Sequence, residues 1–485
     1  MVRARAPRHR GPDTRGYSVP ALRKKPTDRE IDRAIGVLGG CAAGDTLGAR
    51  PPGVWNGNIA MAVAIAEIAG EGPDLRAEGH QDYVVQRWAW WARTADEFDP
   101  VVADVLSVAA EKGITGRSAR EAAAALSGTR PSTNASLART APVALANLRD
   151  EAAVAEAARG ISTLTHADPE AADACALWCL AIRNAVLTGR FDVRIGLGHI
   201  DSERAVLWEE RIAEAERSRP SDFAGVNAGP AGALQGAWSA IAATPVPADD
   251  PASGVFAADH LRLAPEEAVR GGGDGAAVAT IAGGLLGAAY GVSALPWRWR
   301  TALRGWPGLD IRGLANLGYK ILHDGEPDRL GSCGSWLDLP PPRRHPRDEG
   351  VRLGARGWLQ KLPRDVDAVV SLCPVIDADV PVGVRHVEVR LIDHFGANQN
   401  LDFVLFDTVR AIEALRDEGA TVFLHGASGG GRTATVAALY GARRAGIDVA
   451  QALAEVCGVL PSADPNPDFR AALRRLYSSD ERKNR

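Results

Sequence analysis

The sequence changes its pattern once along the chain, and this change restricts the possible folds more than any other feature. From residue 27 to about residue 305 the chain is rich in Ala, and its apolar residues recur at helical spacing. Thr27 and Glu30 have the spacing of a capping box, which predicts the start of the first helix. Small side chains let helices approach closely, so this region predicts a large all-α bundle. Its Ala-rich stretches are 117–126, 140–159, 170–188, 203–217, 231–243 and 275–290.

The region after residue 350 has the pattern of an α/β sheet. Short runs rich in β-branched residues at 367–372, 384–392 and 421–424 predict strands. A helix is predicted between the last two runs, at 402–418, and another from Thr433 to about residue 445. Strands that alternate with helices are typical of an α/β fold. The chain is therefore predicted to be multidomain, an all-α bundle followed by an α/β domain.

The length of 485 residues exceeds what one ordinary core holds, which agrees with two domains. Residues 1–26 are predicted to be a flexible basic tail, and residues 27–320 the helical domain. Gly, Pro and charged residues at 321–350 predict a linker. Residues 351–480 are predicted to be the second domain.

The composition is that of a globular protein, with 46% apolar and 24% charged residues. A net charge of −4 does not suggest a nucleic-acid partner, and the apolar runs do not predict a membrane span. No apolar stretch follows the first arginines, so a secretory signal is not expected. We therefore expect a cytoplasmic protein. The six cysteines form no CxxC pair, and Cys175 and Cys179 are predicted to be buried, reduced thiols on one helix face.

The first motif is a helix with one thin face, formed by Gly36, Gly40 and Gly44, which predicts close packing against another backbone. With the motifs that follow it, this segment resembles the opening helix of the ADP-ribosylglycohydrolase family. The resemblance covers about residues 30–305 and implies an all-helical fold. Its further landmarks are Pro52-Gly53-Val54-Trp55, Asn134-Ala135-Ser136-Leu137, Thr165-His166-Ala167-Asp168-Pro169, Gly272-Gly273-Asp274 and Ala288-Ala289-Tyr290-Gly291.

The resemblance also implies where two Mg²⁺ or Mn²⁺ ions would bind, because the family takes its ligands from two carboxylate motifs. The first falls here on Asn56-Gly57-Asn58-Ile59, and the second on Asp274-Gly275-Ala276-Ala277. Asp274 is the one carboxylate left in these motifs, and residues 49–52 lack an expected Glu. One carboxylate offsets little of a charge of +4, and Mg²⁺ loses water reluctantly, so no metal cofactor is expected.

The second motif is a glycine-rich turn between a predicted strand and a predicted helix, His425-Gly426-Ala427-Ser428-Gly429-Gly430-Gly431-Arg432-Thr433. Such a turn directs backbone N–H groups at one point, and the N-terminus of the helix adds positive potential. Arg432 can bind a phosphate with two hydrogen bonds. The turn therefore predicts a phosphate-binding loop.

This loop resembles the signature of the cysteine-dependent protein phosphatases of the dual-specificity type, over roughly residues 335–478. His425, Gly429, Arg432 and Thr433 match the signature, and Gly431 belongs to the same loop. Gly426 stands where the family has its nucleophilic Cys, and the resemblance makes Asp393 the general acid. Glycine has no side chain, so covalent phosphoryl transfer cannot begin there. Ser428 lies on another side of the loop, and Cys373 is predicted to be a structural thiol.

Three functions remain open from the sequence. The leading prediction is a catalytically silent protein whose partner is a phosphorylated or ADP-ribosylated protein or small molecule. The second is an active Mg²⁺-dependent hydrolase that removes ADP-ribose from protein side chains with an unusual site around Asp274. The third is an interaction protein without a small ligand. The missing site residues fit a natural pseudoenzyme and a deliberately altered chain equally well.

Overall fold

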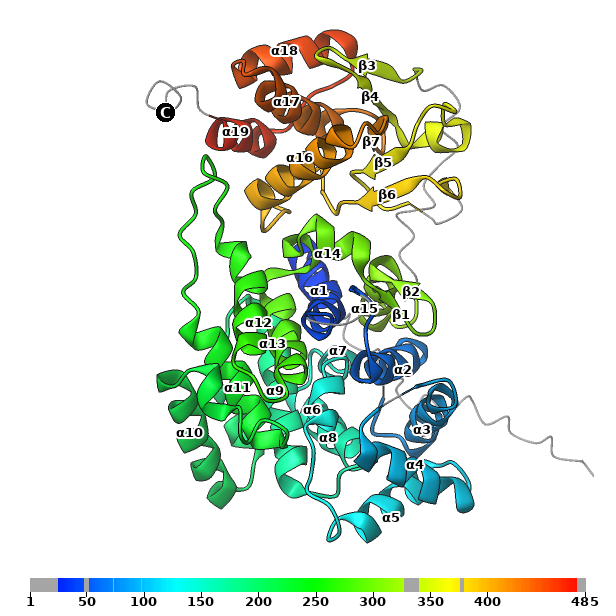
Figure 1. The fold of residues 1–485 in the computed structure, drawn as a ribbon, viewed down its shortest axis with the longest axis vertical. Coiled ribbons are helices and arrows are strands. Elements are labelled where there is room, and N and C mark those ends of the chain that lie inside the picture. The colour runs from blue at the N-terminus through cyan, green and yellow to red at the C-terminus, as the bar shows by residue number, and fades with distance from the viewer. Residues whose placement is uncertain are drawn as a thin grey trace, which may run out of the picture.

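The computed structural model describes residues 25–47, 52–72, 74–96, 98–326, 340–375 and 379–477. The predicted tail, up to residue 24, and residues 327–339 of the predicted linker lie outside these ranges, as do residues 48–51 and Cys333. Figure 1 shows a large helical part and a smaller α/β part stacked on it. The predicted multidomain fold is confirmed.

Helices α1–α15 form the helical part (Figure 1). Their bounds are α1 Asp28–Asp45, α2 Gly57–Glu71, α3 Glu78–Ala92, α4 Pro100–Glu111, α5 Gly116–Leu126, α6 Ala135–Arg139, α7 Val143–Ala146, α8 Glu151–Ser162, α9 Pro169–Thr188, α10 Ser202–Arg217, α11 Pro230–Ala243, α12 His260–Arg270, α13 Gly275–Tyr290, α14 Trp297–Ala302 and α15 Ile311–Leu322. A small hairpin of β1 Arg304–Gly305 and β2 Leu309–Asp310 precedes α15.

Helices α1 and α13 pack backbone to backbone at the centre of the helical part. The Thr27–Glu30 capping box that starts α1 is present, as predicted. A Cβ atom on Gly40 would overlap the carbonyl of Gly283, and one on Gly287 would overlap the carbonyl of Gly36. The glycine face of α1 therefore meets a glycine face of α13, and this contact explains the spacing seen in the sequence.

Helix α9 is surrounded by other helices. Cys175 and Cys179 on it are fully buried, as predicted, and Trp178 donates a hydrogen bond to the carbonyl of Ile281 on α13. By length and composition α9 alone among the described helices could cross a membrane, but 78% of its most apolar window is buried inside the protein. Core helices commonly have this composition.

The α/β part contains a five-stranded sheet in the order β3-β4-β7-β5-β6. The strands are β3 Arg343–His345, β4 Asp348–Ala355, β5 Ala368–Ser371, β6 Arg385–Glu388 and β7 Val422–Gly426. β3 is antiparallel to β4, and the other neighbours are parallel. The helices are α16 Leu401–Asp417, α17 Gly431–Ala445, α18 Val449–Val459 and α19 Pro467–Leu476. β3 and the start of β4 lie inside the range predicted to be a linker, so that prediction was wrong for residues 343–350.

The two parts share an interface with a buried ion pair. Arg300 of α14 binds Asp407 of α16 at 2.9 Å, and both side chains are almost fully buried. Asp407 also accepts a hydrogen bond from the backbone of Trp297, and Arg300 donates one to the carbonyl of Glu388 in β6. These bonds fix the orientation of the sheet relative to the bundle.

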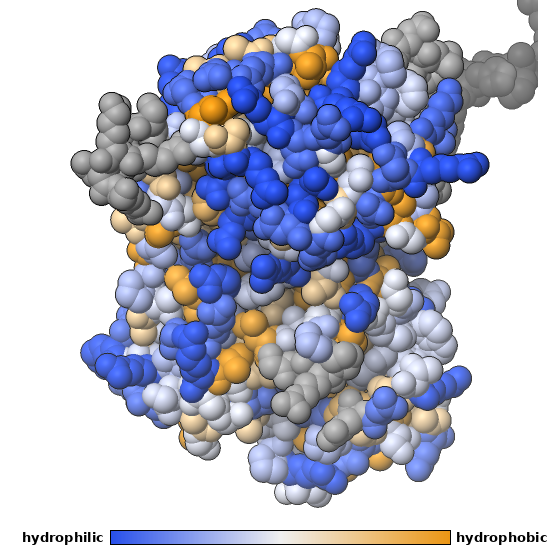
Figure 2. Space-filling model, turned by 45° about the horizontal axis from the view of Figure 1, so that its top comes forward, coloured by the Kyte–Doolittle hydropathy of each residue, from blue (hydrophilic) through white to orange (hydrophobic). Residues whose placement is uncertain are grey.

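A long connection between α11 and α12 extends the interface along α16 (Figure 1). Phe256 at its end packs against Phe403 and Phe406, with ring centroids 5.7 and 5.4 Å apart. Gly254 has a φ of +72° and lies against the ring of Phe406, where a side chain would overlap it. Figure 2 shows that hydrophilic residues cover most of one face, with hydrophobic residues in small groups.

Candidate functional site

A cleft of about 600 Å³ opens in the helical part where α2, α4 and α13 begin. It lies where the sequence placed the two carboxylate motifs, because α2 starts with the first motif and α13 with the second. The polar residues that line it are Asn56, Asn58, Thr94, Asp96, Asp99, Asn134 and Asp274, and the aromatic residues are Trp55, Trp91, Phe98 and Trp306.

The first motif begins α2 and leaves little room for a metal ligand. Asn56 caps the helix, because its side chain accepts a hydrogen bond from the backbone N–H of Asn58. A Cβ atom on Gly57 would lie 2.9 Å from Cη2 of Trp91. The Trp91 ring thus occupies the space into which a side chain at residue 57 would project.

The second motif begins α13. Asp274 is its N-cap and accepts a hydrogen bond of 2.7 Å from Asn134. Asn227 accepts one from the backbone N–H of Asp274 and donates another to the carbonyl of Gly272. These bonds hold the glycine turn before Asp274. Ala276 and Ala277 lie in the first turn of α13 and have no side-chain atom that could bind a cation.

Sequence reasoning missed a second carboxylate at this site, that of Asp45 at the end of α1. It accepts hydrogen bonds from the backbone of Asn56 at 2.7 Å and from Thr280 at 3.2 Å. Burial raises the pKa of Asp45 to about 7, the two hydrogen bonds oppose this, and the charge of Asp274 adds to it. The position of Asp45 directly after Gly44, the last glycine of the thin face of α1, was the sequence signal that could have identified it.

The donor set does not fit a pair of divalent ions. Asp274 and Asp45 carry at most two negative charges, and the raised pKa of Asp45 favours its neutral form. Within the described ranges, no three His, Cys, Asp or Glu side chains lie together as a metal site requires. The amides at 56 and 58 and the alanines at 276 and 277 do not make up the difference.

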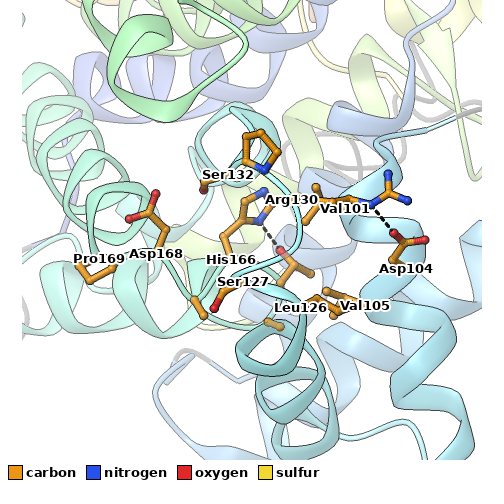
Figure 3. Close-up of a pocket in the computed structure, with 14 residues that line it drawn as sticks. Val101, Asp104, Val105, Leu126, Ser127, Arg130, Ser132, His166, Asp168 and Pro169 are labelled. Carbon is orange, nitrogen blue, oxygen red and sulfur yellow. Dashed lines mark hydrogen bonds and ion pairs between the residues drawn. The ribbon is translucent and has the colours of Figure 1, made fainter.

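A second cavity, of about 290 Å³, lies beside the Thr165–Asp168 landmark (Figure 3). Nε2 of His166 lies 2.8 Å from the hydroxyl of Thr133, and its Nδ1 lies 2.7 Å from the hydroxyl of Thr165. Burial lowers the pKa of His166 to about 3, and the buried Arg139 guanidinium lowers it too, so the ring is neutral at pH 7. An ion pair between Asp104 and Arg130, at 2.9 Å, lies on the other wall.

The glycine-rich loop lies at the C-terminal end of β7, between the sheet and the start of α17. β7 has parallel neighbours on both sides, and ligands of such sheets bind at the carboxyl ends of the strands. Gly429 has a φ of +73°, and a Cβ atom there would lie 3.0 Å from the carbonyl of Gly354. A Cβ atom on Gly431 would lie 2.9 Å from the carbonyl of Asp464. Both positions therefore require glycine.

Arg432 is held at the side of this loop with part of its guanidinium group available. Its Nη1 donates hydrogen bonds to the carbonyls of Leu372 and Leu391, at 3.0 and 3.1 Å. Its Nε lies 3.7 Å from Oδ2 of Asp393, and Oδ1 of Asp393 accepts a hydrogen bond of 3.3 Å from Asn466. The structure thus brings the predicted general acid next to the predicted phosphate ligand.

His425 and Thr433 lie behind the loop. His425 is fully buried, and its Nε2 is 2.7 Å from the hydroxyl of Ser371, which also contacts His386. Burial lowers the pKa of His425 to about 3, so His425 supports the loop as a neutral ring. The hydroxyl of Thr433 is buried without a hydrogen-bond partner among the described residues. It lies 3.2 Å from where a Cβ atom of residue 426 would be.

The two other candidate nucleophiles do not occupy the position of the missing Cys. Ser428 is exposed, whereas Gly426 is buried. Cys373 is buried as predicted, and burial raises the pKa of its thiol to about 11, so it is not a thiolate at neutral pH.

The bundle, its glycine-paired helices and the cleft at their ends form one all-helical scaffold. This chain belongs to the ADP-ribosylglycohydrolase family, whose family model matches residues 26–329. A solved ADP-ribosylglycohydrolase-related protein complex is similar to it, with 21% identity, 61% of this chain and 99% of the other covered, and a TM-score of 0.43. No curated protein sequence matches the chain.

The C-terminal part is similar to solved dual-specificity phosphatases. Human DUSP28 has 26% identity, with 30% of this chain and 97% of the other covered and a TM-score of 0.26. A mouse putative dual specificity phosphatase complexed with zinc tungstate has 24% identity, with 31% and 95% covered and a TM-score of 0.27.

Proposed function

We propose that this chain is a catalytically silent member of its family whose C-terminal part binds phosphate-bearing ligands without turning them over. One observation carries the proposal. Gly426 stands at the head of a loop that has the shape of a phosphate site, where a nucleophile would be needed. The loop joins a central parallel strand to the N-terminus of a helix of 15 residues. Free backbone N–H groups at such a helix start attract an anion.

The charges at the loop favour an anion. No thiolate opposes a phosphate dianion there. Nη1 of Arg432 is used by two carbonyls, and its Nε is 3.7 Å from the Asp393 carboxylate, a contact that a bound phosphate would replace. Ordering the glycines opposes binding by roughly 0.5–1 kcal/mol each relative to Ala. Each hydrogen bond to a charged group returns about 1.5–3 kcal/mol, so binding is favourable overall.

Calorimetric titration of the full chain with phosphate and phosphotyrosine tests the proposal. Both are expected to bind, and Arg432→Ala is expected to abolish binding. Arg444→Ala is the matched control, because Arg444 is on the same helix but pairs with Asp417 at the surface. The chain is also expected to release no ADP-ribose from modified protein with Mn²⁺ added. Release that Asp274→Ala abolishes would contradict the proposal.

The space beside Gly426 allows a sharper test. Gly426→Cys places a thiol next to the unpaired Thr433 hydroxyl, with only a small adjustment at 3.2 Å. This variant is expected to hydrolyse an aryl phosphate, and Asp393→Asn added to it is expected to slow the reaction. If Gly426→Cys folds and binds phosphate but releases no phenol, the loop is not a disabled phosphatase site.

A further inference from the structure

A row of polar side chains runs from the interface between the two parts to the glycine-rich loop. Ser371 of β5 and His425 of β7 are register partners, so their side chains lie on the same face of the sheet. His386 of β6 is the partner of Val369, two residues before Ser371, and therefore lies on this face too. Oγ of Ser371 is 2.8 Å from Nε2 of His386 and 2.7 Å from Nε2 of His425. The three side chains thus connect three neighbouring strands.

Arg312 of α15 contacts this row from the helical part. Its Nη1 lies 3.3 Å from Nδ1 of His386. Its Nε and Nη2 both donate hydrogen bonds of 3.0 Å to Oδ2 of Asp310, which caps the same helix. These two bonds fix the plane of the guanidinium group, so Arg312 directs a donor across the interface at the His386 ring.

The chemistry of arginine fixes the direction of the bond to His386. A guanidinium group only donates hydrogen bonds, so Nδ1 of His386 must accept one. Burial, helped by the charge of Arg312, lowers the pKa of His386 to about 4, although Asp310 opposes this shift. The ring is therefore neutral at pH 7, and its one proton is on Nε2. Nε2 of His386 then donates to Ser371.

The same reasoning applies to the next two bonds. The hydroxyl of Ser371 is buried, and its partners among the described residues are the two rings. Donation by both rings would leave the hydroxyl hydrogen without an acceptor, which is unfavourable, so Ser371 donates to Nε2 of His425. Because the His425 ring is also neutral, its proton is on Nδ1. This nitrogen lies 3.3 Å from the carbonyl of Gly426 and donates to it.

We propose that Arg312 is a positioning residue for the glycine-rich loop and acts through the relay of His386, Ser371 and His425. Each donor in the relay is set by the one before it, and the last bond holds the carbonyl of Gly426 against a buried ring. A carbonyl oxygen bound in this way does not face an anion in the loop, where its negative partial charge would repel the ligand. The inference rests on the proposed function, because it names the residue of the helical part that prepares the phosphate loop.

¹⁵N NMR of the full chain with labelled histidines tests the relay, because protonated and unprotonated ring nitrogens differ in chemical shift. His386 is expected to carry its proton on Nε2, and His425 on Nδ1. In Arg312→Leu both rings are expected to become mixtures of tautomers, and phosphate is expected to bind at least about threefold more weakly in calorimetric titration. Arg312→Lys retains a donor and is expected to rescue both properties. Arg385→Ala is the control, because Arg385 adjoins His386 in β6 but pairs with Glu418 at the surface.

Two results would overturn the inference. A proton on Nδ1 of His386 in the wild type would show that Arg312 does not set its tautomer. Unchanged tautomers or unchanged phosphate affinity in Arg312→Leu would show that the relay does not position the loop.

A second variant covers the case in which Arg312→Leu fails to fold. Ser371→Ala breaks the relay at its middle, so His425 is expected to become a mixture of tautomers while His386 keeps its proton on Nε2. A His425 ring that stays protonated on Nδ1 alone in Ser371→Ala would contradict the relay. If the wild type binds no phosphate, the proposed function fails, whereas the tautomers still decide whether the relay exists.

Discussion

Two glycines mark the sites of this protein, and the structure separates their physical roles. A Cβ atom at residue 57 would lie 2.9 Å from the Trp91 ring, so the ring occupies the space into which a side chain there would project. A Cβ atom at residue 426 would lie 3.2 Å from the Thr433 hydroxyl and 3.7 Å from the side chain of Arg432, so its closest contact is a hydroxyl group. One substitution is therefore expected to introduce a nucleophile into the loop, whereas one substitution cannot supply the carboxylates that a pair of divalent ions would need.

Asp45 gives a prediction at the residue scale. Its pKa in the folded protein is about 7, above the ordinary value of 3.8, so the folded state binds a proton more tightly than the unfolded state. The stability that this group contributes is full below pH 4 and is lost as pH rises toward 7. Asp45→Asn removes the buried charge. The variant is expected to gain on the order of 2–4 kcal/mol relative to wild type between pH 5 and pH 8.

Urea denaturation of both proteins at the two pH values measures this difference. Asp192→Asn is the control, since Asp192 is exposed in the turn before residue 194. A pH-independent difference between Asp45→Asn and wild type would show that Asp45 is ionised throughout this range.

At the scale of elements, the contact of α1 with α13 is the central feature. Each helix has one end at the cleft, Asp45 on α1 and Asp274 at the start of α13. Their other ends contact the loop that carries Asp393. Gln399 and Asn400 of this loop donate hydrogen bonds to the carbonyls of Ala289 and Tyr290, at 2.8 and 2.6 Å. The same pair of helices therefore supports both candidate sites.

Substitution of Gly40 tests this contact. Gly40→Val pushes a branched side chain into the backbone of Gly283, so the helices must separate. The expected loss is more than about 3 kcal/mol of unfolding free energy, which is large for one substitution. Gly79→Ala on α3, where nothing lies within 4 Å, is expected to be neutral or slightly stabilising. Denaturant titration of both variants measures the difference, and equal stabilities would contradict the packing described here.

At the scale of the whole molecule, the buried pair of Arg300 and Asp407 holds the two parts in one orientation. Asp407→Ala leaves the Arg300 charge buried without its partner. Loss of one partner of a buried pair costs about 3–5 kcal/mol. The variant is expected to melt at a lower temperature in scanning calorimetry, with the two parts unfolding separately.

Asp402→Ala on the same helix is the control for this prediction. Asp402 pairs with Arg475, whose side chain is 49% exposed. Such a pair contributes about 1 kcal/mol or less, so this variant should unfold like wild type. A single unshifted transition in Asp407→Ala would show that the interface does not depend on the pair.

The sequence predicted what depends on neighbours along the chain. Helical spacing predicted the bundle, the Thr27–Glu30 capping box predicted the start of its first helix, and the strand–glycine–helix order predicted the turn between β7 and α17. It missed β3 and β4, because β3 is Arg343-Arg344-His345 and β4 begins with Asp348-Glu349-Gly350, which lack the β-branched residues that mark strands. These strands are stabilised by pairing with each other and with β7.

The sequence by itself determined both scaffolds and the absence of a nucleophile at Gly426, because these follow from local spacing and from the lack of a side chain. Only the tertiary structure placed Trp91 against Gly57, Asp45 against Asn56, and Asp393 near Arg432. Residues far apart in the chain meet through packing and through burial of charge, which no local pattern encodes. The cleft lined by aromatic rings and carboxylates is therefore a property of the folded chain, although every residue in it is visible in the sequence.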